Sequence, residues 1–329
     1  MSDNKNLHKA KDQKNDEFYT QFNDVAEELK HYKNHFKGKV VLCNCDDPSW
    51  SAFWKYFHLN FSELGLKRLI STHYVKEVPV SKLFHIDTEA FSYKMTYDGG
   101  NDEDIMIGTK TKLDGNGDFR SEECIKILEE ADIVCTNPPF SLFREYVTQL
   151  MEYGKKFVII GNKSAYTYKE LFPFFMNDEM WMGYRSSSSE FYFNLPNDKI
   201  KEIEENRRID PLWRERSYIK QNGVYVGRVP ACFYTNLDFS KRHEKLILWK
   251  QYNEKEYPKY DNYDAIDVSK TNEIPSDYYE AMGVPVSFLD KHCPEQFKII
   301  GQTNFNGTPT INGRNIYTRI LIKRKDVNA

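Results

Sequence analysis

Short apolar segments alternate with amphipathic segments through the first half of the chain. Compact runs of Val, Ile and Leu predict strands, whereas apolar residues spaced three or four positions apart predict helices. The predicted strands cover 39–45, 67–74, 132–136 and 156–161, and the predicted helices cover 24–36, 50–64, 122–130 and 143–153. Strands and helices that alternate in this way predict an α/β fold with a parallel, doubly wound sheet.

Two of these helices carry clear local signals. In the helix 50–64, the residues Phe53, Trp54, Phe57 and Phe61 recur on one face, and a stripe of this kind is typical of a buried core. Ser121 is a good N-cap for the helix 122–130, whose first turn is acidic.

The pattern changes in two regions. Residues 75–117 contain two glycine-rich turn signals, which predict a hairpin insertion. The second half predicts a more antiparallel region with strands at 180–184, 190–195 and 223–236, and an exposed helix at 199–208. Residues 238–278 lack periodicity and predict a loop-rich connection. Asn312-Gly313 predicts a hairpin turn, followed by a terminal strand at 316–322.

Composition excludes several classes of protein. The 329 residues are 40% hydrophobic and 29% charged, which suits a large domain with a subdomain or two domains. The sequence contains no run of about 18 apolar residues, which a membrane-spanning helix would need. The polar, lysine-rich segment 1–15 predicts a flexible N-terminal arm and not a signal peptide. The six cysteines form no CxxC pair, which indicates reduced thiols in a cytoplasmic protein and no metal site.

Arginines are distributed unevenly along a chain whose net charge is −3. Three precede residue 164 and ten follow it. Arginine suits bidentate contact with phosphates and guanine edges, so the second half is the better candidate for binding nucleic acid. The candidate DNA-binding residues are Arg207, Arg208, Arg214, Arg216, Arg228, Arg314 and Arg319.

The segment Asn137-Pro138-Pro139-Phe140 is the most informative motif. It follows the predicted strand 132–136, and its two prolines make a stiff loop at the strand's carboxyl end, where open α/β sheets bind ligands. Such a loop can present the Asn137 side-chain oxygen and the Pro138 carbonyl to the two protons of an exocyclic amine. Phe140 can then stack on the planar ring that carries the amine.

Three further segments add polar groups near the predicted sheet. Phe18-Tyr19-Thr20 precedes the first helix, and Asn44-Cys45-Asp46-Asp47-Pro48 ends the first strand. Gly117-Asp118-Phe119 precedes the helix 122–130. Acids and amides at such positions can bind an amino-acid moiety, a ribose and an adenine amine, and Phe119 can pack against the adenine.

In this order, the four segments resemble those of the S-adenosylmethionine-dependent amino-methyltransferases of DNA. The chain resembles the EcoRI-type adenine-specific DNA methyltransferases more closely, and over nearly its whole length. The residues that carry this resemblance lie at 7–11, 16–21, 40–48, 282–285 and 294–297, and in the Asn312-Gly313 hairpin with its Arg and Lys.

The resemblance implies a Rossmann-like, mostly parallel seven-stranded sheet with helices on both faces, within a core at 16–236. It also implies a DNA-recognition region at 237–329 and S-adenosylmethionine as the cofactor. A flipped adenine would meet Asn137, Pro138, Pro139 and Phe140. The cofactor would meet residues of the three earlier segments, namely Phe18, Tyr19, Thr20, Asn44, Asp46, Asp47, Asp118 and Phe119.

The chain departs from the common methyltransferase pattern in the loop after the first strand. That loop is usually glycine-rich, but here it reads Asp47-Pro48-Ser49-Trp50-Ser51. No acid ends the second strand either, and Glu77 is the nearest. The cofactor contacts in this part are therefore the least defined.

The favoured function is methylation of N6 of an adenine flipped out of double-stranded DNA. The amine attacks the sulfonium methyl directly, so no covalent intermediate is needed and an Asn suffices to position it. A cytosine C5 enzyme would need a Pro-Cys motif, and none occurs. The same loop would also fit an RNA adenine or a protein glutamine amide. A DNA-binding homologue that has lost turnover is a further alternative.

The resemblance suggests GAATTC as the recognition sequence. We expect a monomer, with any cognate restriction endonuclease acting separately.

Overall fold

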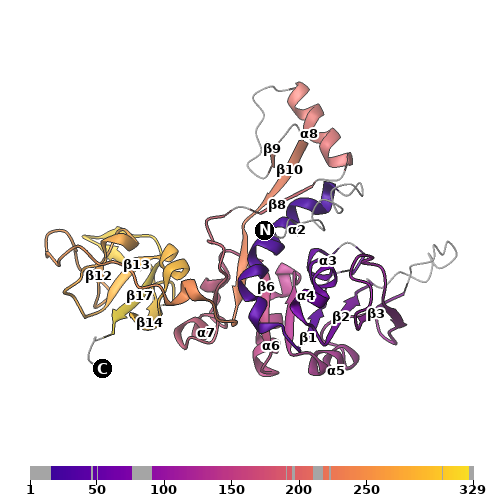
Figure 1. The fold of residues 1–329 in the computed structure, drawn as a ribbon. Helices are drawn as coiled ribbons and strands as arrows, with labels where there is room; N and C mark the ends of the chain where they lie inside the picture. The colour runs from indigo at the N-terminus through magenta and orange to yellow at the C-terminus, as the bar shows by residue number, and fades with distance from the viewer. Residues whose placement is uncertain are drawn as a thin grey trace, which may run out of the picture.

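The computed structural model describes residues 16–45, 47–49, 51–75, 91–189, 191–194, 197–209, 218–221, 224–305 and 307–325. The chain forms a core around a large sheet, an arm that projects from the core, and a C-terminal lobe (Figure 1). Within the described residues, no helix has both the length and the apolar character needed to cross a membrane.

The core sheet has eight strands in the order β4-β3-β2-β1-β5-β6-β11-β7. Strands β3 and β11 run opposite to the other six. The strands are β1 (Val40–Cys43), β2 (Arg68–His73), β3 (Tyr93–Tyr97), β4 (Thr109–Lys112), β5 (Ile133–Thr136), β6 (Lys156–Asn162), β7 (Trp181–Met182) and β11 (Ala231–Thr235). The α/β class is confirmed, but the sheet has eight strands instead of the expected seven, because the hairpin β3–β4 extends it beyond β2.

The helices of the core cover both faces of this sheet. They are α2 (Asp16–Leu29), η1 (Lys30–His35), α3 (Ala52–Leu59), α4 (Phe61–Leu64), α5 (Glu122–Glu130), η3 (Phe140–Leu142), α6 (Phe143–Glu152), η4 (Ala165–Thr167) and α7 (Phe172–Met176). Ser51 and Ser121 accept hydrogen bonds from the N–H groups of Trp54 and Cys124, which caps α3 and α5. The sequence pattern predicted one helix where α3 and α4 stand, placed the start of the first helix at 24 instead of 16, and gave no signal for α7.

Alternation along the central strands explains the two covered faces. Leu42 and Val134 belong to one apolar cluster, with residues of α5, α6 and α7. Their neighbours Val41 and Ile133 belong to the other cluster, with Phe53, Trp54 and other residues of α2 and α3. Strands that are buried on both faces read as continuous apolar runs, which is why the sequence pattern located them well.

The arm interrupts the core between β7 and β11. It contains β8 (Phe191–Asn194), α8 (Asn197–Ile209), β9 (Tyr218–Gln221) and β10 (Val224–Val229), and its sheet has the order β8-β10-β9. The sequence pattern predicted a single strand at 223–236. Pro230 divides that run into β10, which belongs to the arm, and β11, which belongs to the core.

The C-terminal lobe is built on a four-stranded sheet of order β12-β13-β17-β14. Its elements are η5 (Ser240–His243), β12 (Ile266–Asp267), η6 (Thr271–Glu273), β13 (Met282–Pro285), η7 (Val286–Lys291), β14 (Phe297–Gln302), β15 (Thr310–Ile311), β16 (Arg314–Asn315) and β17 (Arg319–Arg324). Apolar residues of the lobe, such as Met282, Phe288 and Ile320, join the same cluster as α5–α7. The lobe therefore packs continuously with one face of the core, and the predicted terminal strand appears as β17.

His243 ties the segment that leads from β11 into the lobe to the start of β14. Its Nε2 lies 2.8 Å from Asp238, which closely follows β11, and its Nδ1 lies 2.7 Å from Glu295, just before β14. Hydrogen bonds to Asp238 and then to Glu295 raise the pKa of His243 above 6.5. Burial acts to raise the pKa of Glu295, but hydrogen bonds from Cys293 and His243 outweigh it and lower the value to about 2.

Cys45 has a strained backbone immediately after β1. Its φ is +66°, in the left-handed region that glycine adopts without a steric penalty. The chain thus makes the turn of the usual glycine-rich loop without a glycine.

We predict that Cys45→Gly leaves the free energy of unfolding unchanged or raises it by up to about 1 kcal/mol, because strain relief offsets the added freedom of the unfolded chain. Cys45→Val should lower it by about 2 kcal/mol, since a β-branched residue tolerates a positive φ poorly. Cys43→Val in β1 is the matched control and should be much milder. Urea unfolding of the three variants measures these differences, and equal effects of the two Val variants would contradict the explanation.

We also predict that the lobe–core junction weakens with rising pH. A raised folded-state pKa means that the contribution of His243 is complete below about pH 6.5 and is lost as pH rises through the raised value. His243→Gln should flatten the dependence of the urea midpoint on pH above 6.5. His35→Gln is the control that leaves both carboxylates opposite His243. An unchanged pH profile in His243→Gln would refute this role.

Candidate active site

The carboxyl ends of β1 and β5 meet at the centre of the sheet. From β1 the chain builds outward through β2, and it then returns to place β5 on the other side of β1. Ligands of open α/β sheets bind at such a switch point. Here the Thr136 hydroxyl donates to the backbone carbonyl of Asn44, and the Tyr146 hydroxyl donates to the Asn44 side-chain oxygen. Asn44 is buried, and its observed contacts join β1, β5 and α6.

The loop after β5 has the stiffness that its prolines predict. Pro139 has φ −57° and ψ 124°, and its carbonyl accepts a hydrogen bond from the N–H of Leu142 at 3.0 Å. Phe140 then begins the short helix η3. Because the Pro139 carbonyl is used by the chain, the Pro138 carbonyl is the better acceptor for a ligand.

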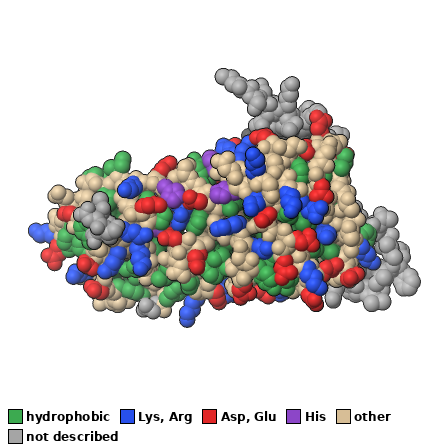
Figure 2. All heavy atoms as spheres, turned by 60° about the horizontal axis from the view of Figure 1, so that its bottom comes forward, with side chains coloured by type: hydrophobic (Ala, Val, Ile, Leu, Met, Phe, Trp, Pro, Cys, Tyr) green, Lys and Arg blue, Asp and Glu red, His purple; other side chains and the backbone are tan. Residues whose placement is uncertain are grey.

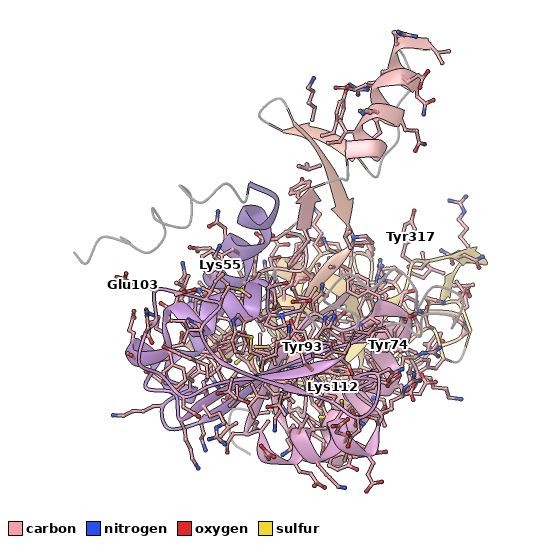
Figure 3. The ribbon with its side chains drawn as sticks, turned by 90° about the vertical axis from the view of Figure 1, so that its right-hand side faces the viewer. Lys55, Tyr74, Tyr93, Glu103, Lys112 and Tyr317 are labelled. Atoms are coloured by element: carbon pink, nitrogen blue, oxygen red, sulfur yellow. The ribbon has the colours of Figure 1, made fainter. Side chains whose placement is uncertain are left out.

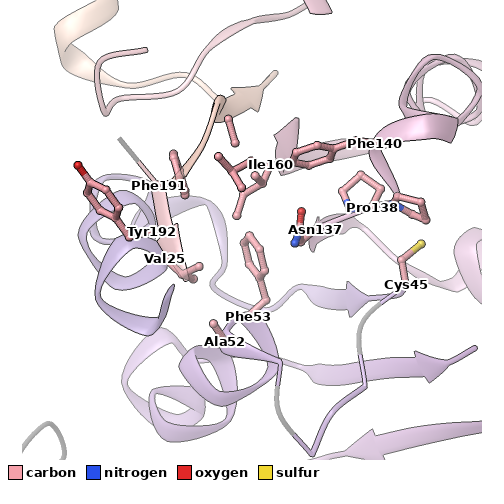
Figure 4. A pocket seen from close by; sticks show the side chains of 13 residues that line it. Val25, Cys45, Ala52, Phe53, Asn137, Pro138, Phe140, Ile160, Phe191 and Tyr192 are labelled. Atoms are coloured by element: carbon pink, nitrogen blue, oxygen red, sulfur yellow. The ribbon is translucent and has the colours of Figure 1, made fainter. Parts of the chain in front are cut away.

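This loop borders a pocket of about 360 Å³, which we call the apolar pocket. Its volume lies within the range of small-molecule sites. The core contributes Phe53 and Ile160, and the base of the arm contributes Phe191 (Figure 4). The complete lining is Val25, Cys45, Ala52, Phe53, Asn137, Pro138, Pro139, Phe140, Ile160, Phe191, Tyr192, Val229 and Ala231.

Asn137 contributes the one side-chain amide among the residues that line this pocket. Its side chain points into the space between Phe53 and Phe140 (Figure 4). Its Oδ1 atom is buried and has no hydrogen-bond partner in the described structure. A buried acceptor without a partner costs free energy, and functional sites are where such costs are retained. An amine donor entering the pocket would satisfy this oxygen.

Asp47 lies beside this crevice but faces β2 and β3. Its Oδ2 is 2.9 Å from Nδ1 of His73, and the Tyr93 hydroxyl donates to Oδ1 at 3.2 Å. The N–H of Ser49 also donates to Oδ1, at 2.7 Å. These contacts hold the carboxylate in place. The Ser49 hydroxyl donates to Oδ1 as well, at 2.5 Å. A carboxylate accepts about four hydrogen bonds, so a ligand at Asp47 must replace one of these partners.

The Gly117-Asp118-Phe119 segment lies against the end of β2. Gly117 has φ +81°, and a Cβ added there would stand 2.4 Å from the His73 carbonyl, so only glycine fits. Arg120 makes a two-point contact with Asp118, at 2.9 and 2.7 Å, and these bonds lower the pKa of Asp118. Phe119 is buried and packs edge-on against Tyr146.

A second concavity, the polar groove, lies beyond the same loop. It has a volume of about 690 Å³ and is bordered by Phe119 and Arg120, by Ser141 and Leu142, and by α6. Gln149 of α6 lines it, and its Oε1 is buried without a hydrogen-bond partner in the described structure. Residues 137–142 therefore separate two concavities, each with one unsatisfied amide oxygen.

Several predicted site residues, or their side chains, lie outside the described part of the structure. Asp46 and Glu77 lie outside the described residues. Phe18, Tyr19 and Thr20 lie in α2, and their side chains are outside the described part of the structure. Sequence analysis expected this segment to precede the first helix, whereas it is part of that helix.

Sequence reasoning missed much of the pocket wall. Phe53 was assigned to the core, and it is 1% exposed, yet it also lines the apolar pocket. Phe191 and Tyr192 come from β8, and Val229 comes from β10. No local signal in the sequence connects these arm residues to Asn137, because only the tertiary fold brings them together.

The candidate DNA-binding arginines lie in different environments. Arg207 and Arg208 are exposed on α8, and Arg207 also donates to the Tyr225 hydroxyl at 3.2 Å. Arg314 is exposed on β16. Arg319 instead forms an ion pair of 2.9 Å with Asp267 in the lobe, where the two side chains are 12% and 7% exposed. Arg214 and Arg216 lie outside the described residues, as does the side chain of Arg228.

Comparison with known proteins identifies the family of this chain. Three relatives align over almost their full length. Type II methyltransferase M.EcoRI of Escherichia coli is 44% identical over 98% of this chain and 97% of its own. Type II methyltransferase M.MpnI of Mycoplasma pneumoniae is 35% identical over 97% and 98%, and M.MgeORF184P of Mycoplasma genitalium is 32% identical over 98% and 99%. No solved structure matches. Residues 6–308 match the family model of the adenine-specific methyltransferase EcoRI, and the chain belongs to this family of DNA methyltransferases.

Proposed function

We propose that this enzyme transfers a methyl group from S-adenosylmethionine to N6 of an adenine flipped out of duplex DNA, and that the apolar pocket receives the base. The observation that carries the proposal is the buried, unpartnered Oδ1 of Asn137 in a mostly apolar lining. An adenine offers the matching donor, the exocyclic amine. A stacked and paired base cannot enter such a pocket, so the base must leave the helix.

The residues of the pocket divide the work. Asn137 and the Pro138 carbonyl accept the two amine protons and hold the nitrogen lone pair toward the methyl donor. Phe140 supplies a stacking face for the base. The apolar wall excludes water, which strengthens the few polar contacts made inside. S-Adenosylmethionine supplies the electrophilic methyl group when it is bound.

Asp47 and Asp118 are the proposed cofactor residues. Asp47 follows the carboxyl end of β1, and Asp118 lies in the segment against the end of β2 and keeps acceptor capacity beside Arg120. The polar groove beside Phe119 offers the unsatisfied oxygen of Gln149. Acceptors of this kind suit ribose hydroxyls, an ammonium group and an adenine amine. These acceptors therefore fit the hydroxyl, ammonium and amine groups of the cofactor. Asn44 and Phe119 would act through the packing that holds these loops.

We further propose that residues 237–329 recognise DNA together with the arm. The last strand of the core sheet ends at Thr235, which supports a boundary there. On the face in Figure 2, basic and acidic side chains are interspersed, so phosphate binding must depend on local groups. Arg314 is exposed near the Asn312-Gly313 turn, and Tyr317, 88% exposed, extends away from the lobe (Figure 3). The match to a family of adenine-specific DNA methyltransferases favours DNA over an RNA adenine or a glutamine amide as the substrate.

We predict that Asn137→Ala lowers the rate of adenine methylation by about 10²–10³, because one acceptor that positions the amine is lost. Cofactor affinity should stay near that of the wild type. Asp118→Ala should instead act mainly on cofactor affinity and make cofactor binding weaker. Single-turnover methylation and calorimetric titration measure both. Asn101→Ala, an exposed amide, is the control, and a near wild-type rate in Asn137→Ala with saturating cofactor would refute the assignment.

We predict opposite consequences for two arginines of the lobe. Arg314→Ala should weaken DNA binding and reduce the slope of log affinity against log salt by about one, as expected for one lost phosphate contact. Arg319→Ala should lower the free energy of unfolding by about 3 kcal/mol, because it leaves Asp267 buried without its ion-pair partner. Filter binding at several salt concentrations and urea unfolding separate the two effects. Equal salt slopes for wild type and Arg314→Ala would remove Arg314 from the interface.

A further inference from the structure

One segment joins all three parts of the molecule. Residues 184–189, which we call the strap, lead from β7 of the core sheet toward β8 of the arm. The core holds the start of the strap through Glu28 of α2. This fully buried carboxylate accepts hydrogen bonds from the backbone N–H groups of Tyr184 and Arg185, at 2.7 and 2.8 Å.

The start of the strap is packed too closely to move freely. A Cβ added to Gly183 would stand 2.4 Å from Oε1 of Glu28. Arg185 forms an ion pair of 2.5 Å with Asp24 of α2, and its guanidinium lies 5.0 Å from the ring centre of Phe191. Because Phe191 lines the apolar pocket, the position of the strap bears directly on the pocket wall.

The C-terminal lobe holds the middle of the strap through one side chain. Oδ1 of Asp290 in η7 accepts from the N–H of Ser187 at 2.9 Å, and Oδ2 accepts from the hydroxyls of Ser187 and Ser186 at 2.8 and 3.0 Å. These three bonds connect the lobe to the residues that immediately precede the arm.

The direction of Asp290 is informative for a lobe that binds DNA. Phosphates repel a carboxylate, and the carboxylate of Asp290 instead accepts hydrogen bonds from neutral donors of the strap. Its contacts can therefore be removed without removing a contact to DNA. The strap is a short path from the recognition region to the pocket. Along it, hydrogen bonds, the Arg185–Asp24 ion pair and the contact of Arg185 with the Phe191 ring connect Asp290 to the pocket wall.

We propose that Asp290 is a positioning residue, through which the C-terminal lobe sets the strap and thereby the Phe191 side of the apolar pocket. This inference rests on the proposed function, because it takes that pocket to be the site of the target adenine. Asp290 touches neither base nor cofactor. It acts by holding the pocket wall where a flipped base is aligned for transfer, and misplacement of about 1 Å can cost about 10²-fold in rate.

The test compares Asp290→Ala with Asp290→Asn in the full-length enzyme on a duplex that carries the target site. Asp290→Ala should lower kcat by roughly 10- to 100-fold and change KM for DNA by less than about threefold. Asp290→Asn should stay within about threefold of wild type. Its amide oxygen can still accept from the Ser187 N–H, and its amide nitrogen can donate to the rotatable hydroxyls.

Two further variants give the experiment its controls. Glu280→Ala removes an exposed ion pair with Lys323 in the same lobe and should leave kcat unchanged. The double variant Ser186→Ala/Ser187→Ala should reproduce part of the loss, and adding Asp290→Ala to it should cost less than in the wild type, as expected for residues that act together.

The outcomes are distinguishable. Unchanged kcat in Asp290→Ala would overturn the proposal, and so would parallel losses of DNA affinity and thermal stability, which indicate a merely structural role. Asn137→Ala is measured in the same assay. If it retains full activity, the pocket assignment fails. If it is inactive while Asp290→Ala is normal, only the coupling through the strap fails.

Discussion

The parallel pairing of β1 with β5 is the constraint on which the site depends. Val41 pairs with Ile133 and Leu42 with Val134, so the two strands end side by side. The Thr136 hydroxyl and the Asn44 carbonyl close the seam at that end. A shift of one residue would turn every side chain of β5 to the opposite face and move Asn137 away from the switch point. Two apolar layers prevent such a shift, because each accepts only one set of alternating residues.

The apolar pocket combines a rigid loop with a wall from distant parts of the chain. Two prolines restrict the backbone that presents Asn137, so little conformational entropy is lost when a ligand binds. Most of the remaining wall is apolar. An unsatisfied acceptor in such surroundings is unfavourable in the free protein and becomes favourable only when a donor enters. The site is therefore preorganised for its ligand, and the packing of the surrounding core offsets the free-energy cost of the unsatisfied acceptor.

The arm and the C-terminal lobe are not independent attachments. The arm provides Phe191, Tyr192 and Val229 to the pocket, and the lobe shares an apolar cluster with the core. Asp290 adds a polar connection from the lobe to the strap, which contacts the Phe191 side of the pocket. This arrangement gives the lobe a physical route to the pocket, in addition to any contact of its own with DNA.

The sequence by itself determined the elements with strong local patterns. Buried central strands read as apolar runs, the Ser121 cap defined the start of α5, and the double proline marked the loop at Asn137. The motif order also indicated the family. Weak patterns failed where tertiary packing overrode them. The run 223–236 looked continuous, but Pro230 directs its two halves into different sheets.

Only the tertiary structure decided how distant residues are used. Phe53 has the periodicity of a core residue, and periodicity cannot reveal that a buried ring also borders a pocket. The sequence pattern does not distinguish Arg319 from Arg314. In the fold, Arg319 forms an ion pair with Asp267, whereas Arg314 is exposed. Cys45 occupies a glycine-like conformation because the end of β1 requires the turn there. In each case the deciding contact joins residues far apart in the chain, and a local pattern carries no information about such a partner.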